Sequence, residues 1–186
     1  MEPERFSELD DASLSDEQRQ VRDAILAGPR AGMRGPFKAL LRSPGLFDTA
    51  QKLGAHIRFR SSLPRALNEL AILLTARHWT AQFEWHVHHG LALEAGLPPA
   101  VAAAIAEGRR PEGMSAEVAA VHDFVRALLH TGAVPDAEFA AVRERFGEAG
   151  VVDLIGAVGY YTLVSMVLNV DRVQVPGGEL PLRPLP

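Results

Sequence analysis

The sequence of 186 residues predicts an all-α domain, and three observations favour this fold class. Apolar residues recur at spacings of three and four through most of the chain, which is the period of a packed helix. Residues that begin and end helices stand at regular intervals, with serine or proline at the starts and glycine at the ends. No segment shows the sustained alternation of apolar and polar residues that is typical of a half-buried strand.

The N-terminal part of the chain carries three helix starts. Ser15 and Gln18 form a capping box, in which each side chain satisfies a free amide of the first turn. Gly28 ends that helix. Pro36 and Pro44 each stand where a further helix begins, because proline lacks the amide that a first turn leaves unpaired.

The middle of the chain predicts a buried helix followed by a second one. The helix after Pro64 is apolar on nearly every side between Leu67 and Leu74, so we expect it at the centre of the fold. Thr80 is expected to cap the next helix, over residues 81–95.

The remaining chain predicts four more helices, which begin near residues 97, 115, 135 and 151. The last of them is very apolar. The tail after residue 175 has too many prolines and glycines for a helix, so we expect it along a neighbouring element or in solvent.

The length suits one domain with a sizeable core. We divide the chain into an N-terminal helical extension (1–35), a main helical domain (36–175) and a Pro-rich tail (176–186). The central helices are more apolar than one small bundle can cover, which favours an oligomer.

Composition excludes several functions. A net charge of −4 with scattered basic residues argues against nucleic acid as a partner. We find no apolar run that reaches the roughly 18–20 residues that cross a bilayer, and the acidic N-terminus does not resemble a targeting segment, so we expect a cytoplasmic protein without membrane contact. The chain has no cysteine, which excludes disulfides, thiolate metal sites and thiol chemistry.

The stretch QFEWHVHHG (82–90) concentrates residues able to transfer protons. Glu84 and His88 are four residues apart and therefore adjacent on a helix, at the edge of an apolar stripe that includes Phe83 and Val87. Glu69 lies inside the apolar central helix, where a carboxylate is costly unless it is paired. Together Glu69, Glu84 and His88 could give and take protons near neutral pH.

Four segments carry a family resemblance: PRALNELAIL (64–73), EWHVHHGLALEAGLPP (84–99), VHDFVRALL (121–129) and VGYYTLVSMVLN (158–169). They resemble the carboxymuconolactone decarboxylase / alkyl hydroperoxidase D superfamily, in a region that covers about residues 37–175. The resemblance implies a multi-helix, orthogonal alkyl hydroperoxidase D-like domain that assembles as a homotrimer or homohexamer.

The chain departs from that superfamily at the cysteines. Its thiol peroxidases carry a glutamate on one helix, then a Cys-x-x-Cys and a histidine on the next. Glu69 and His88 match the glutamate and the histidine, whereas Ala81 and Glu84 stand at the cysteine positions. Since that peroxidase mechanism needs two thiols, we expect no thiol peroxidase activity.

These residues predict a lyase-like enzyme without cofactor or metal, which decarboxylates, hydrates or isomerises a small organic acid or lactone. His88 would be the general acid or base, Glu84 would orient it, and Glu69, kept partly protonated by burial, would be a second proton donor. Weaker substrate-binding candidates are Trp85, Arg58, Arg77, Tyr160 and Tyr161.

Three alternatives remain open at this point. Glu84 and His88 could be an ordinary surface pair at a spacing of four residues. The protein could have lost catalysis and persist as a small-molecule-binding or structural oligomer. A metal-dependent enzyme could use Glu69, Glu84 and His88 as ligands, although the chain has no HExxH motif.

Overall fold

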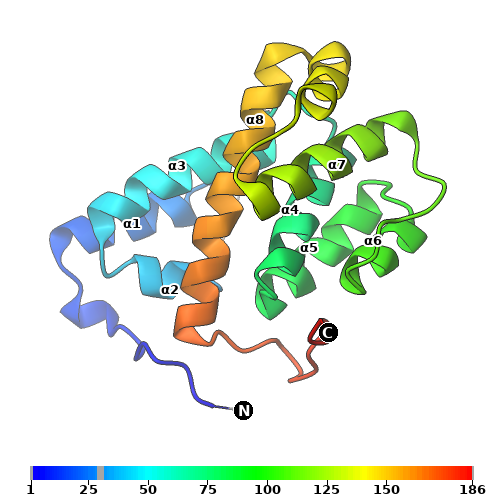
Figure 1. Ribbon diagram of the computed structural model, residues 1–186. Helices are drawn as coiled ribbons and strands as arrows, with labels where there is room; N and C mark the ends of the chain where they lie inside the picture. The colour runs from blue at the N-terminus through cyan, green and yellow to red at the C-terminus, as the bar shows by residue number, and fades with distance from the viewer. Residues whose placement is uncertain (1, 29–31, 186) are drawn as a thin grey trace.

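The chain folds into a bundle of crossing helices, seen in a computed structural model that describes residues 2–28 and 32–185 (Figure 1). No strand occurs within those ranges, which confirms the all-α prediction. The elements in chain order are a short 3-10 helix η1 (Asp11–Ser13) and the α-helices α1 (Asp16–Leu26), α2 (Phe37–Leu40), α3 (Pro44–Arg60), α4 (Arg65–His78), α5 (Gln82–Glu94), α6 (Pro99–Ala106), α7 (Ala116–Thr131) and α8 (Asp136–Asp171).

Most of the predicted helix boundaries are confirmed. Ser15 caps α1 as part of a complete capping box, and Ser115 caps α7, which Gly132 closes in a left-handed conformation at φ 71°. The prediction for Thr80 is wrong. Ala81 is the N-cap of α5, without a side-chain cap, because Thr80 belongs to the turn from α4 and has a φ of 47°.

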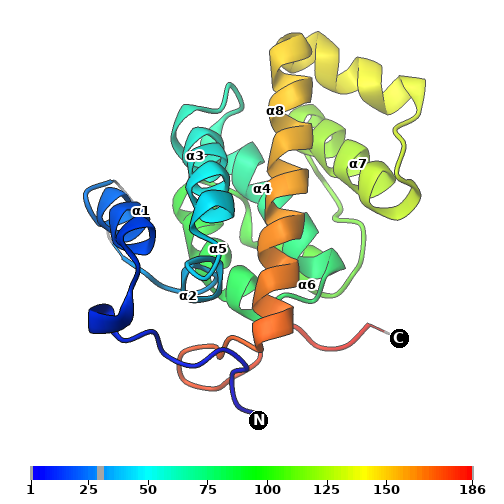
Figure 2. The same ribbon diagram turned by 90° about the vertical axis from the view of Figure 1, so that its left-hand side faces the viewer.

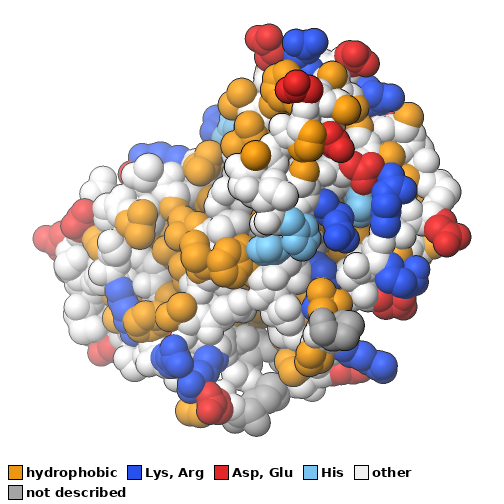
Figure 3. All heavy atoms as spheres, in the orientation of Figure 1, with side chains coloured by type: hydrophobic (Ala, Val, Ile, Leu, Met, Phe, Trp, Pro, Cys, Tyr) orange, Lys and Arg blue, Asp and Glu red, His pale blue; other side chains and the backbone are white. Residues whose placement is uncertain are grey.

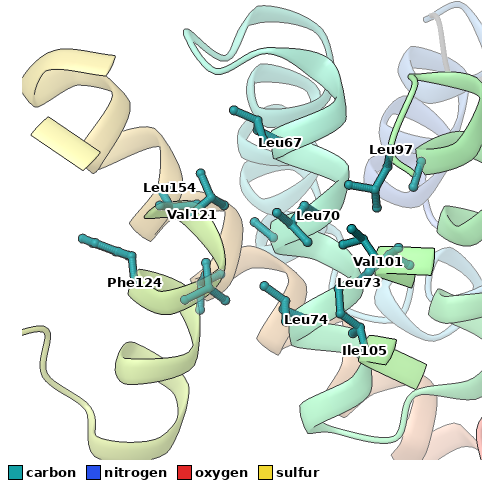
Figure 4. Close-up of a cluster of buried hydrophobic side chains, with 14 of the residues drawn as sticks. Leu67, Leu70, Leu73, Leu74, Leu97, Val101, Ile105, Val121, Phe124 and Leu154 are labelled. Atoms are coloured by element: carbon teal, nitrogen blue, oxygen red, sulfur yellow. The ribbon is translucent and has the colours of Figure 1, made fainter. Parts of the chain in front are cut away.

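Helix α4 lies at the centre of the molecule, as its apolar sequence predicted. Every residue from Leu67 to Arg77 is buried, and α4 contacts α3, α5, α6, α7 and α8. Figure 4 shows its leucines between two groups of apolar side chains. Val121 and Phe124 of α7 and Leu154 of α8 lie on one side, and Leu97, Val101 and Ile105 from the α6 region on the other. Burial of this apolar surface is the main force that holds α4 in place.

Helix α8 is bent at Gly147, whose φ of 70° and ψ of 179° interrupt the helix. The two helical parts on either side correspond to the two helices that the sequence predicts. The long part contains a stretch of 18 residues with a mean hydropathy of 1.8, half of it buried inside the protein. By length and composition alone it could span a membrane, so the expectation that no apolar stretch is long enough is wrong. The buried half of the stretch packs within the protein, where α8 contacts α3, α4 and α7.

The N-terminal segment and the start of the tail both pass near the C-terminal end of α8 (Figures 1 and 2). Asp171 is fully buried there, and its Oδ1 accepts hydrogen bonds from the amides of Arg5 and Phe6. The tail lies along a neighbour, which was one of the two expected outcomes. Leu182 is buried in the core, and its amide and carbonyl both bond to the side chain of Gln82 on α5.

Candidate active site

Glu69, Glu84 and His88 form one buried cluster between α4 and α5. Glu69 Oε2 lies 2.7 Å from His88 Nδ1, and Glu84 Oε1 lies 2.9 Å from His88 Nε2. Each of the three residues is at most 5% exposed. The imidazole ring therefore bridges two carboxylates, and the surface-pair alternative is excluded.

The buried side of α5 differs from the predicted one. Glu84, Trp85, His88 and Ala92 are buried on this helix, whereas Val87, expected to face the core, is 37% exposed. The hydrophobic periodicity of a helix predicts that its polar residues face solvent, but here the two carboxylates and the imidazole form hydrogen-bonded pairs with one another. Such mutual pairing allows polar groups to be buried that would be costly alone.

The two carboxylates determine the charge of His88. Burial disfavours the imidazolium and by itself would lower the pKa, but the charges of Glu84 and Glu69 and their hydrogen bonds raise the pKa of His88 to about 9. At neutral pH the ring is therefore an imidazolium, and both of its N–H groups donate to carboxylates. A general base needs a free nitrogen lone pair, which this His88 does not have.

A pocket of about 660 Å³ opens beside the cluster. Glu84 and His88 line it, whereas Glu69 lies behind His88 and does not. Aromatic side chains form much of the remaining wall: Phe37, Phe83, Tyr160 and Tyr161. Two of the cationic side chains in the lining are Lys38 and Arg58. This volume suits a small organic molecule.

Tyr161 lies directly against His88, with the two ring centroids 5.0 Å apart and the rings edge to face. Burial, followed by the negative charge of Glu84, raises the pKa of the Tyr161 hydroxyl well above its usual range. The hydroxyl therefore stays neutral and can donate a hydrogen bond to an oxygen in the pocket.

The five weaker candidates fall into two groups. Arg58, Tyr160 and Tyr161 line the pocket. Trp85 and Arg77 do not: Trp85 is 3% exposed and stacks on His89, and Arg77 is buried and donates to the carbonyl of Arg183 in the tail.

Sequence reasoning missed other wall residues because they come from distant segments. Phe37 and Lys38 of α2, Phe83 of α5, and Val173 and Gln174 after α8 all line the pocket. No local pattern marks them. Phe83 was assigned to the core, and the remaining residues have no motif around them.

The cluster does not have the geometry of a metal site. Both ring nitrogens of His88 face carboxylate oxygens, so neither is available to an ion shared with Glu69 and Glu84. Across the residues that the structure describes, no group of three His, Cys, Asp or Glu side chains could hold an ion.

Comparison with solved structures identifies the fold. One crystal structure, of an uncharacterised peroxidase-related protein from Ralstonia eutropha JMP134 described as an alkylhydroperoxidase AhpD core, matches with a TM-score of 0.75. The match covers 94% of this chain and 93% of that one, at 18% sequence identity. The chain has an AhpD-like fold. No family model matches the sequence, and neither does any curated protein.

The AhpD-like fold agrees with the family resemblance found in the sequence. That resemblance places cysteines at positions 81 and 84, so the residues that stand there bear on the chemistry of the pocket. The chain contains no cysteine, and glutamate stands at position 84. The side chain that faces the pocket beside His88 is thus a carboxylate.

Proposed function

We propose that this AhpD-like protein is a cofactor-free acid–base enzyme that acts on a small organic acid or lactone. The observation that carries the proposal is the position of Glu84, a buried carboxylate that lines a small-molecule pocket and is paired with an imidazolium. Hydration and isomerisation need a proton acceptor in this position, and decarboxylation needs a group that delivers a proton to the carbon that has lost CO2.

The charge of His88 favours an exchange of the roles that the sequence predicted. Glu84 would accept a proton from a carbon next to a carbonyl group, and the electron pair of the broken C–H bond would move to the carbonyl oxygen. Return of the proton from Glu84 to another carbon would complete an isomerisation. His88, held from behind by Glu69, would be a positioning residue that fixes the carboxylate of Glu84.

Further side chains suit the substrate in this mechanism. The neutral hydroxyl of Tyr161 can donate to the oxygen on which negative charge develops. Cationic side chains in the same lining, among them Arg58 and Lys38, favour a substrate with a carboxylate group. The substrate is therefore proposed to be a small anion with an acidic C–H bond.

Deuterium exchange tests the proposal. The protein is incubated in D2O with a panel of 2-oxo acids, 3-oxo acids and unsaturated lactones, and NMR follows deuterium uptake, double-bond migration and loss of carboxylate. We expect turnover of at least one compound, and a loss of roughly 10²- to 10⁴-fold in Glu84→Gln, because that substitution removes the proton acceptor.

Glu94→Gln is the matched control. Glu94 is on the same helix but is exposed and pairs with Arg65 at 3.8 Å, outside the pocket lining. It should keep full activity. Turnover that survives in Glu84→Gln would refute the proposed base.

A non-catalytic oligomer is the second candidate, favoured by exposed apolar side chains. Figure 3 shows hydrophobic side chains gathered on the face where α8 lies in front. The large exposed apolar side chains of α3 and of the part of α8 after Gly147 are Leu46, Leu53 and Phe59 of α3 and Val152, Ile155, Met166 and Val170 of α8. Such a surface suits association with further copies of the chain, as a homotrimer or homohexamer. Binding of panel compounds without turnover would favour this candidate.

A further inference from the structure

A lysine in the pocket wall is held by two glutamates of the N-terminal segment. Lys38 Nζ lies 2.7 Å from Glu4 Oε2 and 2.6 Å from Glu8 Oε1, and all three residues line the pocket. The side chain of Lys38 is only 18% exposed, whereas that of Glu8 is 85% exposed. One partly buried cation is thus paired with two carboxylates, one of which is almost entirely in water.

The N-terminal segment does not depend on Glu8 for its position. The amides of Arg5 and Phe6 bond to Asp171, and Arg42 Nη2 donates to the carbonyl of Ser7 at 2.6 Å. These contacts fix the backbone just before Glu8. The side chain of Glu8 can therefore leave Lys38 while the segment stays in place.

We propose that Lys38 is the carboxylate-binding group of this pocket, and that the carboxylate of a ligand takes the place of Glu8. The exchange replaces one ion pair with another, and the displaced carboxylate of Glu8 is already mostly solvated, so the exchange costs little. The remaining glutamate, Glu4, also accepts from the amide of Gln174 and stays on Lys38.

The walls indicate the rest of the ligand. Phe37, Phe83, Tyr160 and Tyr161 line the same pocket, and aromatic walls favour a flat apolar body. The ligand class that fits Lys38 and these rings is a small planar or aromatic monocarboxylate. This inference deepens the proposed function, on which it rests for the use of the pocket, but its test measures binding and needs no turnover.

Benzoate and benzamide are the probes, because they share one shape and differ in charge. Calorimetric titration at low salt should show that the wild-type protein binds benzoate more tightly than benzamide. Glu8→Gln removes the competing carboxylate and should tighten benzoate binding by about two- to fivefold, the worth of an exposed ion pair, while benzamide binding is unchanged. Lys38→Met should abolish the preference for benzoate.

Two further variants sharpen the result. Glu2→Gln is the control, since Glu2 is in the same segment but pairs with Arg172 and does not line this pocket; its benzoate affinity should equal that of the wild type. Arg58→Met should retain the preference for benzoate.

Three results would overturn the inference: equal affinities for benzoate and benzamide in the wild type and Glu8→Gln, no binding of either probe, or a preference that survives in Lys38→Met and vanishes in Arg58→Met. Should Lys38→Met fail to fold, Glu8→Gln alone decides. A protein that binds benzoate in this way but turns over no compound in D2O keeps this inference and loses the proposed function.

Discussion

The buried ion pairs of His88 predict a specific loss of stability at alkaline pH. Below pH 6.5 both the folded and the unfolded chain carry the proton of His88, so the contribution of this residue is complete. Above pH 6.5 the unfolded chain releases the proton, while the folded chain holds it up to about pH 9. The free energy of unfolding therefore falls as the pH rises through this window.

The size of this effect follows from the pKa shift. A rise from 6.5 to about 9 corresponds to about 3 kcal/mol of preference for the charged form in the folded state. His88 is 3% exposed, so solvent screens this interaction little. His78 and His122, whose pKa values are lowered first by burial, act on stability below pH 6.5 and leave the window unaffected.

Urea unfolding followed by circular dichroism at pH 6, 7.5 and 9.5, at one protein concentration, measures the effect. The wild type should lose about 3 kcal/mol more than His88→Gln between the two extremes, because the variant has no proton to release there. Should that variant be too unstable, NMR of the histidine ring nitrogens in the wild type should show one imidazolium that persists to about pH 9. Equal pH dependence in both proteins, or a His88 that is neutral at pH 7.5, would refute the charged ring.

Two further predictions concern backbone and tail, and urea unfolding checks both. Gly147→Ala should lower the free energy of unfolding by roughly 1–3 kcal/mol, because φ 70° and ψ 179° strain any residue with a Cβ. Its control is Gly159→Ala, at an exposed helical site of α8 with open space around it, which should raise the free energy of unfolding by up to about 1 kcal/mol. A Gly147→Ala protein as stable as the wild type would contradict the bend. Leu182→Ala should cost about 2–5 kcal/mol, since this side chain is 2% exposed in the core. Its control Leu180→Ala, at a residue that is 53% exposed, should change stability by less than about 0.5 kcal/mol, and equal effects of the two would mean that the tail does not dock as described.

Local rules explain what the sequence could predict. The apolar run of α4, the capping box at Ser15 and the adjacency of Glu84 and His88 depend only on residues within one helix. These features are all present in the structure. Glu69 was singled out as a carboxylate inside an apolar helix, and the resemblance supported its place beside the pair, but its contact with His88 depends on the packing of α4 against α5.

Long-range polar pairing explains what the sequence could not predict. Periodicity placed Val87 within the apolar stripe and Glu84 and His88 only at its edge, whereas both polar residues are buried and Val87 is exposed. The burial of His88 depends on a partner 19 residues away. The contacts of Lys38 with Glu4 and Glu8 likewise join side chains whose local sequence shows no pattern.

The pocket wall is completed late during synthesis of the chain, because its residues come from distant parts of the sequence. The lining begins at Glu4 and ends at Pro176, so it draws on nearly the first and nearly the last residues of the chain. A ribosome makes the chain from the N-terminus, so α1 to α7 are synthesised before Tyr161. A nascent or prematurely ended chain can contain Glu69, Glu84 and His88 but lacks the wall that α8 supplies. Ligand binding in this pocket is therefore expected only from chains that have been synthesised through Pro176.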